Sequence, residues 1–327
     1  MTNDKFPMTK ILDSRLRGND KVIICGALAY DRIMDFPGKF SEHILAGQTH
    51  ILNLSFTVGG VKESFGGTGG NISYSLALLG EKPKLVAVAG KDFVKYKTWL
   101  LKNKIDLSGV KVTKDELTAS AYILTDLDDN QITAFYPGSK IPLAPNVRGG
   151  KNALAIIAPD LVARMVKYAK IFRQKGVPYI FDPGQQLAYY NRTDLLDSVK
   201  GAIMTIGNDY EIEMMRRKLA VKLEKLAELA KTLVITKGGK GTELYNKNKK
   251  IFIPAARKKA VVDPTGAGDA YRAGLIKGLA LGLELKQCAR LASVTAAYAV
   301  EKQGTQNHRF SWEGVKKRYE ENYHEII

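Results

Sequence analysis

Cysteine and histidine are scarce in this chain, which has two cysteines and four histidines among 327 residues. Cys25 and Cys288 are too few for a disulfide framework, as is typical of a reducing compartment. The histidines show no metal-ligand spacing with nearby cysteines, so a structural zinc site is disfavoured. Apolar runs are short, and none approaches the ~20 residues that span a bilayer. We therefore expect a cytoplasmic protein without a membrane segment.

Acidic residues are outnumbered, because 50 Lys and Arg against 33 Asp and Glu leave a net charge of +17. The basic residues form short separate clusters, at 216–218, 247–250, 257–259 and 316–318. A protein that follows a phosphate backbone needs a contiguous basic stripe, often with stacking aromatics. Dispersed clusters are more typical of a solvated face. Nucleic-acid binding is therefore a distant alternative, which affinity for random DNA at two salt concentrations would test.

Residues 1–20 are polar and aperiodic, which predicts a poorly ordered leader before a domain over 21–327. In that domain short apolar runs alternate with helical patterns. This indicates an α/β fold with a mostly parallel central sheet covered by helices on both faces. The expected strands are 22–25, 85–89, 153–157, 179–181, 202–205 and 233–236, with an antiparallel edge hairpin at 243–245 and 251–253. The expected helices are 70–79, 93–104, 161–175, 210–229, 270–281 and 285–302.

A second region alternates apolar and polar residues with period two, which is typical of a sheet with two different faces. Residues 52–58 follow this pattern, and Gly59-Gly60 predicts a hairpin turn into a strand over 61–65. Residues 119–125 and 131–136 form a second predicted hairpin. These segments predict a small antiparallel sheet, separate from the main body.

The most informative segment is 263–269, Asp-Pro-Thr-Gly-Ala-Gly-Asp, directly before a helical pattern. Glycines in this position let backbone N–H groups converge on an anion, and the helix dipole adds positive charge. Such a site suits a phosphoryl group in transfer, while Asp269 can accept the proton of an attacking hydroxyl. The alternative is that Asp269 is only a helix N-cap and the glycines only permit a turn. The second carboxylate, Asp263, favours the functional interpretation.

A second glycine-rich segment, 66–71 (Gly-Gly-Thr-Gly-Gly-Asn), precedes another helical pattern. Close approach of the backbone to a polar ligand would explain it, and a flexible hinge would explain it equally well. Residues 236–242 lack the Ser or Thr that completes a Walker A loop. The first strand and helix carry no G-x-G-x-x-G, which disfavours a dinucleotide-dependent dehydrogenase.

Together these segments resemble the PfkB/ribokinase family of small-molecule kinases. The paired motifs at 66–71 and 263–269 carry the resemblance, and 208–211 (N-x-x-E) and 236–241 (T-x-G-x-x-G) support it. The chain is similar within this family to bacterial adenosine kinases, through the strings at 36–42, 135–138, 182–188, 269–274 and 304–306. The resemblance implies a ribokinase-like fold whose β lid is built from about 31–66 and 107–140.

The resemblance also implies roles for individual residues. Asp269 matches the catalytic base, and the anion hole matches the backbone of Gly266, Ala267 and Gly268. Substrate contacts match Asp31, Gly66, Gly67, Asn71, Phe135, Gln185 and Gln186. The ATP site matches Asn208, Thr236, Gly238 and Gly241. Glu211 matches a position that organises Mg²⁺ through water or phosphate. A second lid aromatic of the related kinases falls at Ala121.

The implied reaction is ATP- and Mg²⁺-dependent phosphorylation of a primary hydroxyl, with the 5′-OH of adenosine as the expected acceptor. The runner-up is a kinase acting on a ribose- or fructose-like sugar, which needs no aromatic base pocket. A scaffold with a degenerate kinase fold is a third alternative. By analogy we also expect a homodimer formed through the lid, and a monovalent cation such as K⁺ beside the 263–269 loop.

Overall fold

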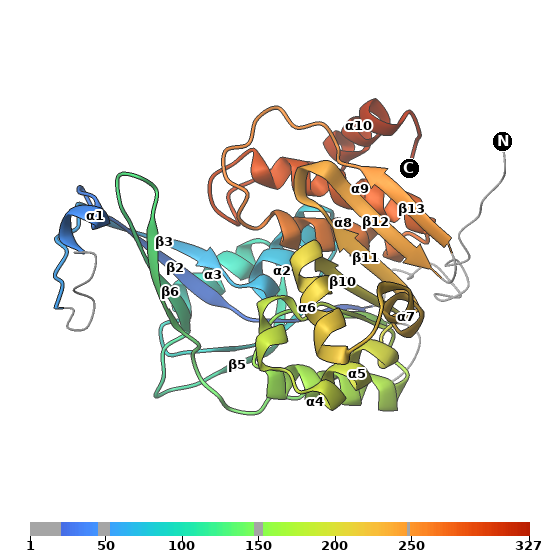
Figure 1. Ribbon diagram of the computed structural model, residues 1–327, viewed down its shortest axis with the longest axis horizontal. Helices are drawn as coiled ribbons and strands as arrows, with labels where there is room; N and C mark the ends of the chain where they lie inside the picture. Colours follow the sequence, from blue (N-terminus) through green and yellow to red (C-terminus); the bar gives the residue numbers. More distant parts are fainter. Residues whose placement is uncertain (1–20, 45–52, 147–152, 247–248) are drawn as a thin grey trace.

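The computed structural model describes residues 21–44, 53–146, 153–246 and 249–327, so the expected leader over 1–20 lies outside them. In these residues a nine-stranded sheet forms the body (Figure 1), in the order β13-β12-β11-β10-β9-β8-β1-β4-β5. Seven strands are parallel: β1 (Lys21–Cys25), β4 (Lys84–Ala89), β5 (Asp106–Val112), β8 (Ala153–Ile157), β9 (Tyr179–Phe181), β10 (Met204–Asn208) and β11 (Thr232–Thr236). The antiparallel edge pair is β12 (Gly241–Asn246) and β13 (Lys249–Pro254).

Helices cover both faces of this sheet, as the sequence predicts. Alternate residues of β1 point to opposite faces, so Ile24 joins one apolar cluster and Ile23 the other. The first cluster lies under α2 (Thr68–Leu78), α3 (Val94–Lys102), α8 (Ala267–Ala280), α9 (Leu285–Val300) and α10 (Trp312–Tyr323). The second lies under α4 (Val162–Lys175), α5 (Arg192–Gly201), α6 (Asp209–Leu219) and α7 (Leu223–Leu229). A bilayer-spanning helix is absent from the described ranges, since none has the necessary length and apolarity.

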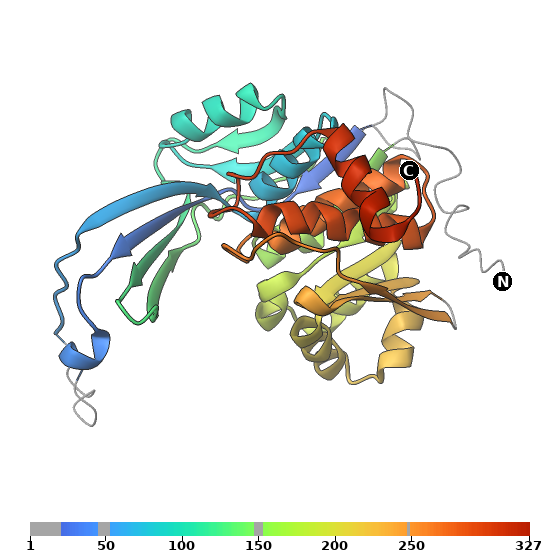
Figure 2. The same ribbon diagram turned by 90° about the horizontal axis from the view of Figure 1, so that it is seen from above.

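A four-stranded lid projects from the body (Figure 2), with α1 (Phe40–His43) near its far end. Its order is β3-β2-β6-β7, formed by β2 (Ala29–Asp35), β3 (Gly60–Gly66), β6 (Ala119–Thr125) and β7 (Gln131–Tyr136). The predicted β6–β7 hairpin is confirmed residue for residue. The β3–β2 and β6–β7 pairs are antiparallel, whereas β2 and β6 run parallel where the two halves of the lid meet.

Two details of the predicted lid are wrong. Residues 53–58 form no strand, and β3 pairs with β2 instead. Of the apolar residues before Gly59, Phe56 packs edge-on against Phe36 and Phe40 in a local aromatic cluster, whereas Leu54 is exposed. Residues 107–112 also lie outside the lid, since β5 pairs with β4 at the edge of the large sheet.

The predicted helix over 210–229 is two helices. Ala220 has a left-handed conformation (φ 55°), which ends α6, and α7 begins three residues later. A glycine is the usual residue at such a position, so its absence hid the break from sequence analysis. The helices α5 and α10 were also not expected, because neither has a long apolar stripe.

The parallel strands bring the motif residues together at one edge of the sheet. The carboxyl ends of β1, β8 and β9 are followed by Ala27, Pro159 and Asp182, and β11 ends at Thr236. This is where ligands bind in open α/β sheets. The lid reaches over the same edge, because β2 leaves the body directly after Ala27 and Leu28.

Candidate active site

Two cavities lie on either side of the loop at 263–269. The first, of about 230 Å³, lies between the lid and the body and is bordered by Thr265, Gly266 and Asp269 of the loop. The second, of about 450 Å³, lies between the β11–β13 edge and helices α8 and α9 and is bordered by Ala267 and Gly268. The loop therefore separates the two cavities, and neighbouring residues of the loop border different cavities.

Asp263 organises this loop. Its carboxylate accepts hydrogen bonds of 2.8 Å from the N–H groups of Thr265 and Gly304. Partial burial opposes ionisation, but these hydrogen bonds outweigh it and lower the pKa of Asp263. Gly266 then turns the chain into α8 with a φ of +78°, and a Cβ atom there would lie 3.1 Å from the Thr305 side chain. The second carboxylate of the motif thus has a structural role.

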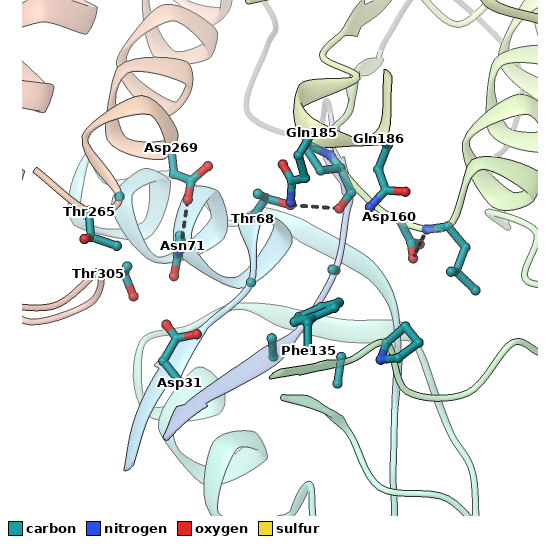
Figure 3. A pocket seen from close by; sticks show the side chains of 18 residues that line it. Asp31, Thr68, Asn71, Phe135, Asp160, Gln185, Gln186, Thr265, Asp269 and Thr305 are labelled. Carbon is teal, nitrogen blue, oxygen red and sulfur yellow. Dashed lines mark hydrogen bonds between the residues drawn. The ribbon is translucent and has the colours of Figure 1, made fainter. Parts of the chain in front are cut away.

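Asp269 lies in the first turn of α8, and its side chain points into the first cavity (Figure 3). The helix N-cap is Gly266, so the interpretation of Asp269 as a simple cap is wrong. The side-chain amide of Asn71 donates a 2.8 Å hydrogen bond to Asp269 Oδ2. Burial raises the pKa of Asp269 to about 6, against the lowering effects of Arg272 and Asn71. A carboxylate with this pKa can serve as a general base near neutral pH.

The glycines of 66–71 are closely packed against other parts of the protein, which disfavours a flexible hinge. A Cβ atom on Gly66 would lie 2.3 Å from Asp31 Oδ2, so this glycine makes room for the carboxylate of Asp31. Gly67 caps α2 with a φ of +82° and borders the first cavity. A Cβ atom on Gly70 would lie 2.0 Å from the hydroxyl of Tyr96. The segment that joins the lid to α2 is therefore so tightly packed that a side chain at Gly66 or Gly70 would clash.

Three residues form a row across the lid. The strand register places Asp31 beside Ala121, and Ala121 beside Phe135. Asp31 and Phe135 both point toward the first cavity (Figure 3), and burial raises the pKa of Asp31. Ala121 is not among the residues that line this cavity, and the hydroxyl of Tyr122 beside it accepts a hydrogen bond from Arg32. Phe135 is thus the aromatic ring that the lid offers to a ligand here.

Gln185 and Gln186 lie on the 3₁₀ helix η2 (Gly184–Tyr189) and line the end of the first cavity that faces Phe135 and Asp160 (Figure 3). This short turn is fixed from below by α6. The ammonium group of Lys218 donates hydrogen bonds of 2.6 to 2.9 Å to three backbone carbonyls, those of Leu187, Ala188 and Tyr190. A basic residue that sequence analysis assigned to a solvated cluster therefore supports the cavity.

The second cavity contains the expected nucleotide loop. Thr236, Gly238 and Gly241 all line it, together with small apolar residues of α9. Gly241 has a φ of +127°, and a Cβ atom there would lie 2.1 Å from the carbonyl oxygen of Ile253. Arg257 and Lys258, from another basic cluster, lie at its border.

Asn208 and Glu211 border neither cavity. They form a capping box at the start of α6, in which each side chain accepts a 2.8 Å hydrogen bond from the other residue's backbone N–H. Burial and the nearby charge of Asp182 raise the pKa of Glu211. The observed contacts of this pair are those of a helix N-terminus.

The structure adds residues that sequence analysis did not single out. Arg272 and Asp182 form a buried bidentate ion pair that joins α8 to the end of β9, beside Gly268. Gln306 is buried and donates a hydrogen bond to Asn71. Arg272 and Gln306 lie in the segments at 269–274 and 304–306, which carry the family resemblance. The resemblance of these segments is the sequence signal that could have identified them.

Comparison with known proteins gives a consistent result. Residues 42–311 match the pfkB family carbohydrate kinase. A nucleoside kinase from Methanocaldococcus jannaschii is 31% identical over 309 residues, which cover 93% of this chain and 98% of the relative. The solved structure of Burkholderia thailandensis nucleoside kinase in complex with inosine is similar, with a TM-score of 0.80 and 35% identity over 93% of this chain and 99% of that one.

A cytidine kinase from Thermococcus kodakarensis is 28% identical over 80% of this chain and 96% of its own. The matches to these relatives cover 96–99% of their own lengths. The family match covers more than half of the chain, including both glycine-rich segments. The chain therefore belongs to the pfkB family of carbohydrate kinases and is a phosphotransferase that acts on a hydroxyl group.

Proposed function

We propose that this protein is a nucleoside kinase that transfers the terminal phosphoryl group of ATP to the 5′-OH of a nucleoside such as adenosine. The observation that carries the proposal is the loop shared by the two cavities. Asp269 faces the first cavity, whereas the backbone of Ala267 and Gly268 faces the second. An alcohol in one cavity and a triphosphate in the other would meet at this loop.

In the proposed reaction, Asp269 takes the proton of the 5′-OH group. The 5′ oxygen of the nucleoside forms a bond to the terminal phosphorus of ATP, and ADP leaves. The start of α8 presents backbone N–H groups and a positive dipole end to the transferring phosphoryl group. Asp31 is placed to accept hydrogen bonds from ribose hydroxyls, and Phe135 to stack on the base. General-base assistance contributes roughly 10²–10⁴-fold to the rate.

Magnesium would be held mainly by phosphate oxygens and water, since no group of three or more potential metal ligands lies among the described residues. Mg²⁺ keeps several waters and binds through one or two carboxylates together with phosphate oxygens, and so needs no full cage of protein ligands. Burial and the nearby charge of Asp182 raise the pKa of Glu211, so a cation close to Glu211 would offset the repulsion between the two carboxylates. When bound, the ion would neutralise charge on the phosphates. A monovalent cation beside the 263–269 loop stays a prediction.

One end of the first cavity, where a nucleobase would lie, favours a nucleoside over a free sugar. Phe135, Gln185 and Gln186 offer an aromatic face and amide groups, whereas Asp31 and Asp269 lie at the other end (Figure 3). A sugar alone would engage the carboxylates and leave the aromatic and amide groups without a ligand. Inosine, which is bound in the similar Burkholderia thailandensis nucleoside kinase, has the same division into base and ribose, as does cytidine, after which the similar Thermococcus kodakarensis kinase is named.

A substrate panel tests the proposal. ATP consumption is measured with adenosine, inosine, cytidine, ribose and fructose under identical conditions. We expect kcat/KM for at least one nucleoside to exceed that for either sugar by 100-fold or more. Turnover confined to ribose or fructose would contradict the nucleoside assignment and favour the sugar kinase alternative.

We further propose that the lid mediates a homodimer. Its strands carry exposed apolar side chains, with Val61 61% and Ile132 44% exposed, which is unfavourable in water. A second copy of the same sheet would cover them. Sedimentation analysis of the protein and of the double variant Val61→Lys, Ile132→Lys tests this, because the variant should sediment as a monomer. A monomeric unmodified protein would contradict the proposal.

A further inference from the structure

A chain of hydrogen bonds joins the Asp269 carboxylate to α3 on the far side of α2. The indole Nε1–H of Trp99 donates to Gln306 Oε1 at 2.9 Å. Gln306 Nε2 donates to Asn71 Oδ1 at 2.9 Å, and Asn71 Nδ2 donates to Asp269 Oδ2 at 2.8 Å. Gln306 and Asn71 are only 3% and 4% exposed. The two amides in the middle of the relay (Trp99, Gln306, Asn71, Asp269) are thus shielded from water.

The direction of each hydrogen bond in the relay is fixed by chemistry. An indole N–H can only donate, so the oxygen of the Gln306 amide must face Trp99 and its nitrogen must face Asn71. Asn71 then accepts from Gln306 through its oxygen, which turns its own nitrogen toward Asp269. Neither amide can be reversed without placing two donors or two acceptors in contact.

Tyr96 fixes the same direction independently. Its hydroxyl donates a 2.8 Å hydrogen bond to the Gly66 carbonyl, which can only accept. The single hydroxyl hydrogen is thereby used, so Tyr96 must accept from Gln306 Nε2 at 2.6 Å. Burial raises the pKa of Tyr96, which keeps the hydroxyl protonated. Both hydrogens of the Gln306 amide are therefore assigned, one to Asn71 and one to Tyr96.

We infer that Trp99 and Gln306 are positioning residues for the phosphoryl-transfer reaction, which hold the Asn71 amide as a permanent donor to Asp269 Oδ2 and leave Oδ1 for the substrate hydroxyl. The inference rests on the proposed role of Asp269 as the base. Asn71 could rotate its amide by 180° at little steric cost, and only its partners prevent this. A reversed amide would place its oxygen against the carboxylate and remove the donor.

The charges around Asp269 set the expected effect of such a reversal. Arg272 on the same helix stabilises the carboxylate, whereas Asp31 from the lid and Asp182 from the end of β9 destabilise it. Tyr96 on α3 faces the same region as a neutral hydroxyl. A lost hydrogen bond from Asn71 would make the carboxylate harder to ionise, by about one pH unit for a bond to a charged group. Activity would then require higher pH.

The variant Gln306→Glu tests the relay, because a carboxylate can accept from Trp99 but cannot donate to Asn71. We expect the acid limb of the kcat/KM profile to move upward by about one pH unit. The loss of activity should be about tenfold on the acid limb and small at pH 9, with the KM for ATP unchanged. Asn307→Glu is the matched control, since it adds the same charge on the exposed neighbouring residue and should leave the limb in place.

The buried charge of Gln306→Glu could prevent the protein from folding, so two neutral variants are tested as well. Gln306→Met and Trp99→Phe remove one link each and should move the limb in the same direction by a smaller amount, with helical circular dichroism unchanged. Folded variants with unmoved acid limbs, beside an inactive Asp269→Asn, would overturn the relay and leave the proposed function standing. An active Asp269→Asn would instead overturn the proposed function.

Discussion

The two cavities are built in opposite ways. Among the described residues that line it, the first cavity, the proposed substrate cavity, has three carboxylates (Asp31, Asp160 and Asp269) and no lysine or arginine. The second, the proposed nucleotide cavity, has two cations, Arg257 and Lys258, and no carboxylate among its described lining residues. The first is lined by side chains from the lid, α2, η2 and α8, whereas the second is lined largely by glycine, alanine and valine of the C-terminal half.

This difference follows the charge of the proposed ligands. A nucleoside is neutral and offers hydroxyls, which carboxylates can accept and deprotonate. A nucleotide triphosphate is an anion, so cations and backbone N–H groups suit it. Substrate selectivity in such an arrangement depends on a few side chains from distant elements. Nucleotide binding depends on backbone shape, which glycine and small apolar residues maintain.

The largest effect is expected for Asp269, on the loop between the two cavities. Asp269→Asn keeps the hydrogen bond from Asn71 but cannot take a proton, so kcat should fall by about 10²–10⁴-fold with nucleoside affinity almost unchanged. Steady-state kinetics and calorimetric binding of the nucleoside measure the two quantities. Asp209→Asn, in the first turn of α6, is the matched control. A variant with more than about a tenth of the wild-type turnover would remove Asp269 from the mechanism.

A change at Asp31, which lines the substrate cavity only, should separate the effects on nucleoside binding and on ATP binding. Asp31→Asn weakens charged hydrogen bonds worth about 1.5–3 kcal/mol, so the KM for the nucleoside should rise by about 10–100-fold. The KM for ATP should stay within a factor of about two, since Asp31 is not part of the nucleotide cavity. Asp35→Asn, farther along the same strand and paired with Lys62, is the control. Equal changes in both KM values would contradict the separation of the two cavities.

The raised pKa of Asp269 also has a cost in stability. Its pKa rises from 3.8 to about 6 on folding, so the folded state favours the protonated form and loses stability as pH increases through this range. Asp269→Asn avoids this loss. The variant should gain up to about 3 kcal/mol of unfolding free energy relative to wild type at pH 8, and little near pH 4. Urea denaturation at both pH values measures it, and a pH-independent difference would refute the raised pKa.

The smallest effect is expected at the border of the nucleotide cavity. Lys258 is exposed, so Lys258→Ala should raise the KM for ATP only about two- to fivefold and leave the KM for the nucleoside unchanged. The effect should shrink in added salt because exposed charges are screened. Lys97→Ala, an exposed lysine of α3 outside both cavities, is the control. A selective effect on the nucleoside would reverse the assignment of the cavities.

Local patterns predicted most of the scaffold. Short apolar runs identified six of the seven parallel strands of the body, because strands buried on both faces contain few polar residues. The partly exposed edge strand β5 lacks such a run and was missed. The alternation at 119–136 identified the β6–β7 hairpin. The same reasoning failed at 53–58, which form no strand and from which Phe56 packs in an aromatic cluster. It also failed at Ala220, where the chain adopts a left-handed turn without glycine.

The sequence by itself identified the two glycine-rich segments that precede helices, where backbone N–H groups can bind an anion. It also determined the candidate base, Asp269, which follows directly from that motif. Only the tertiary structure decided that Asp269 meets Asn71, that Asp31 and Phe135 share a lid face, and that Gln306 donates a hydrogen bond to Asn71. The hydrogen-bonded pairs among these residues are up to 235 positions apart in sequence, so their contacts arise from packing of the sheet and helices, which no local pattern encodes.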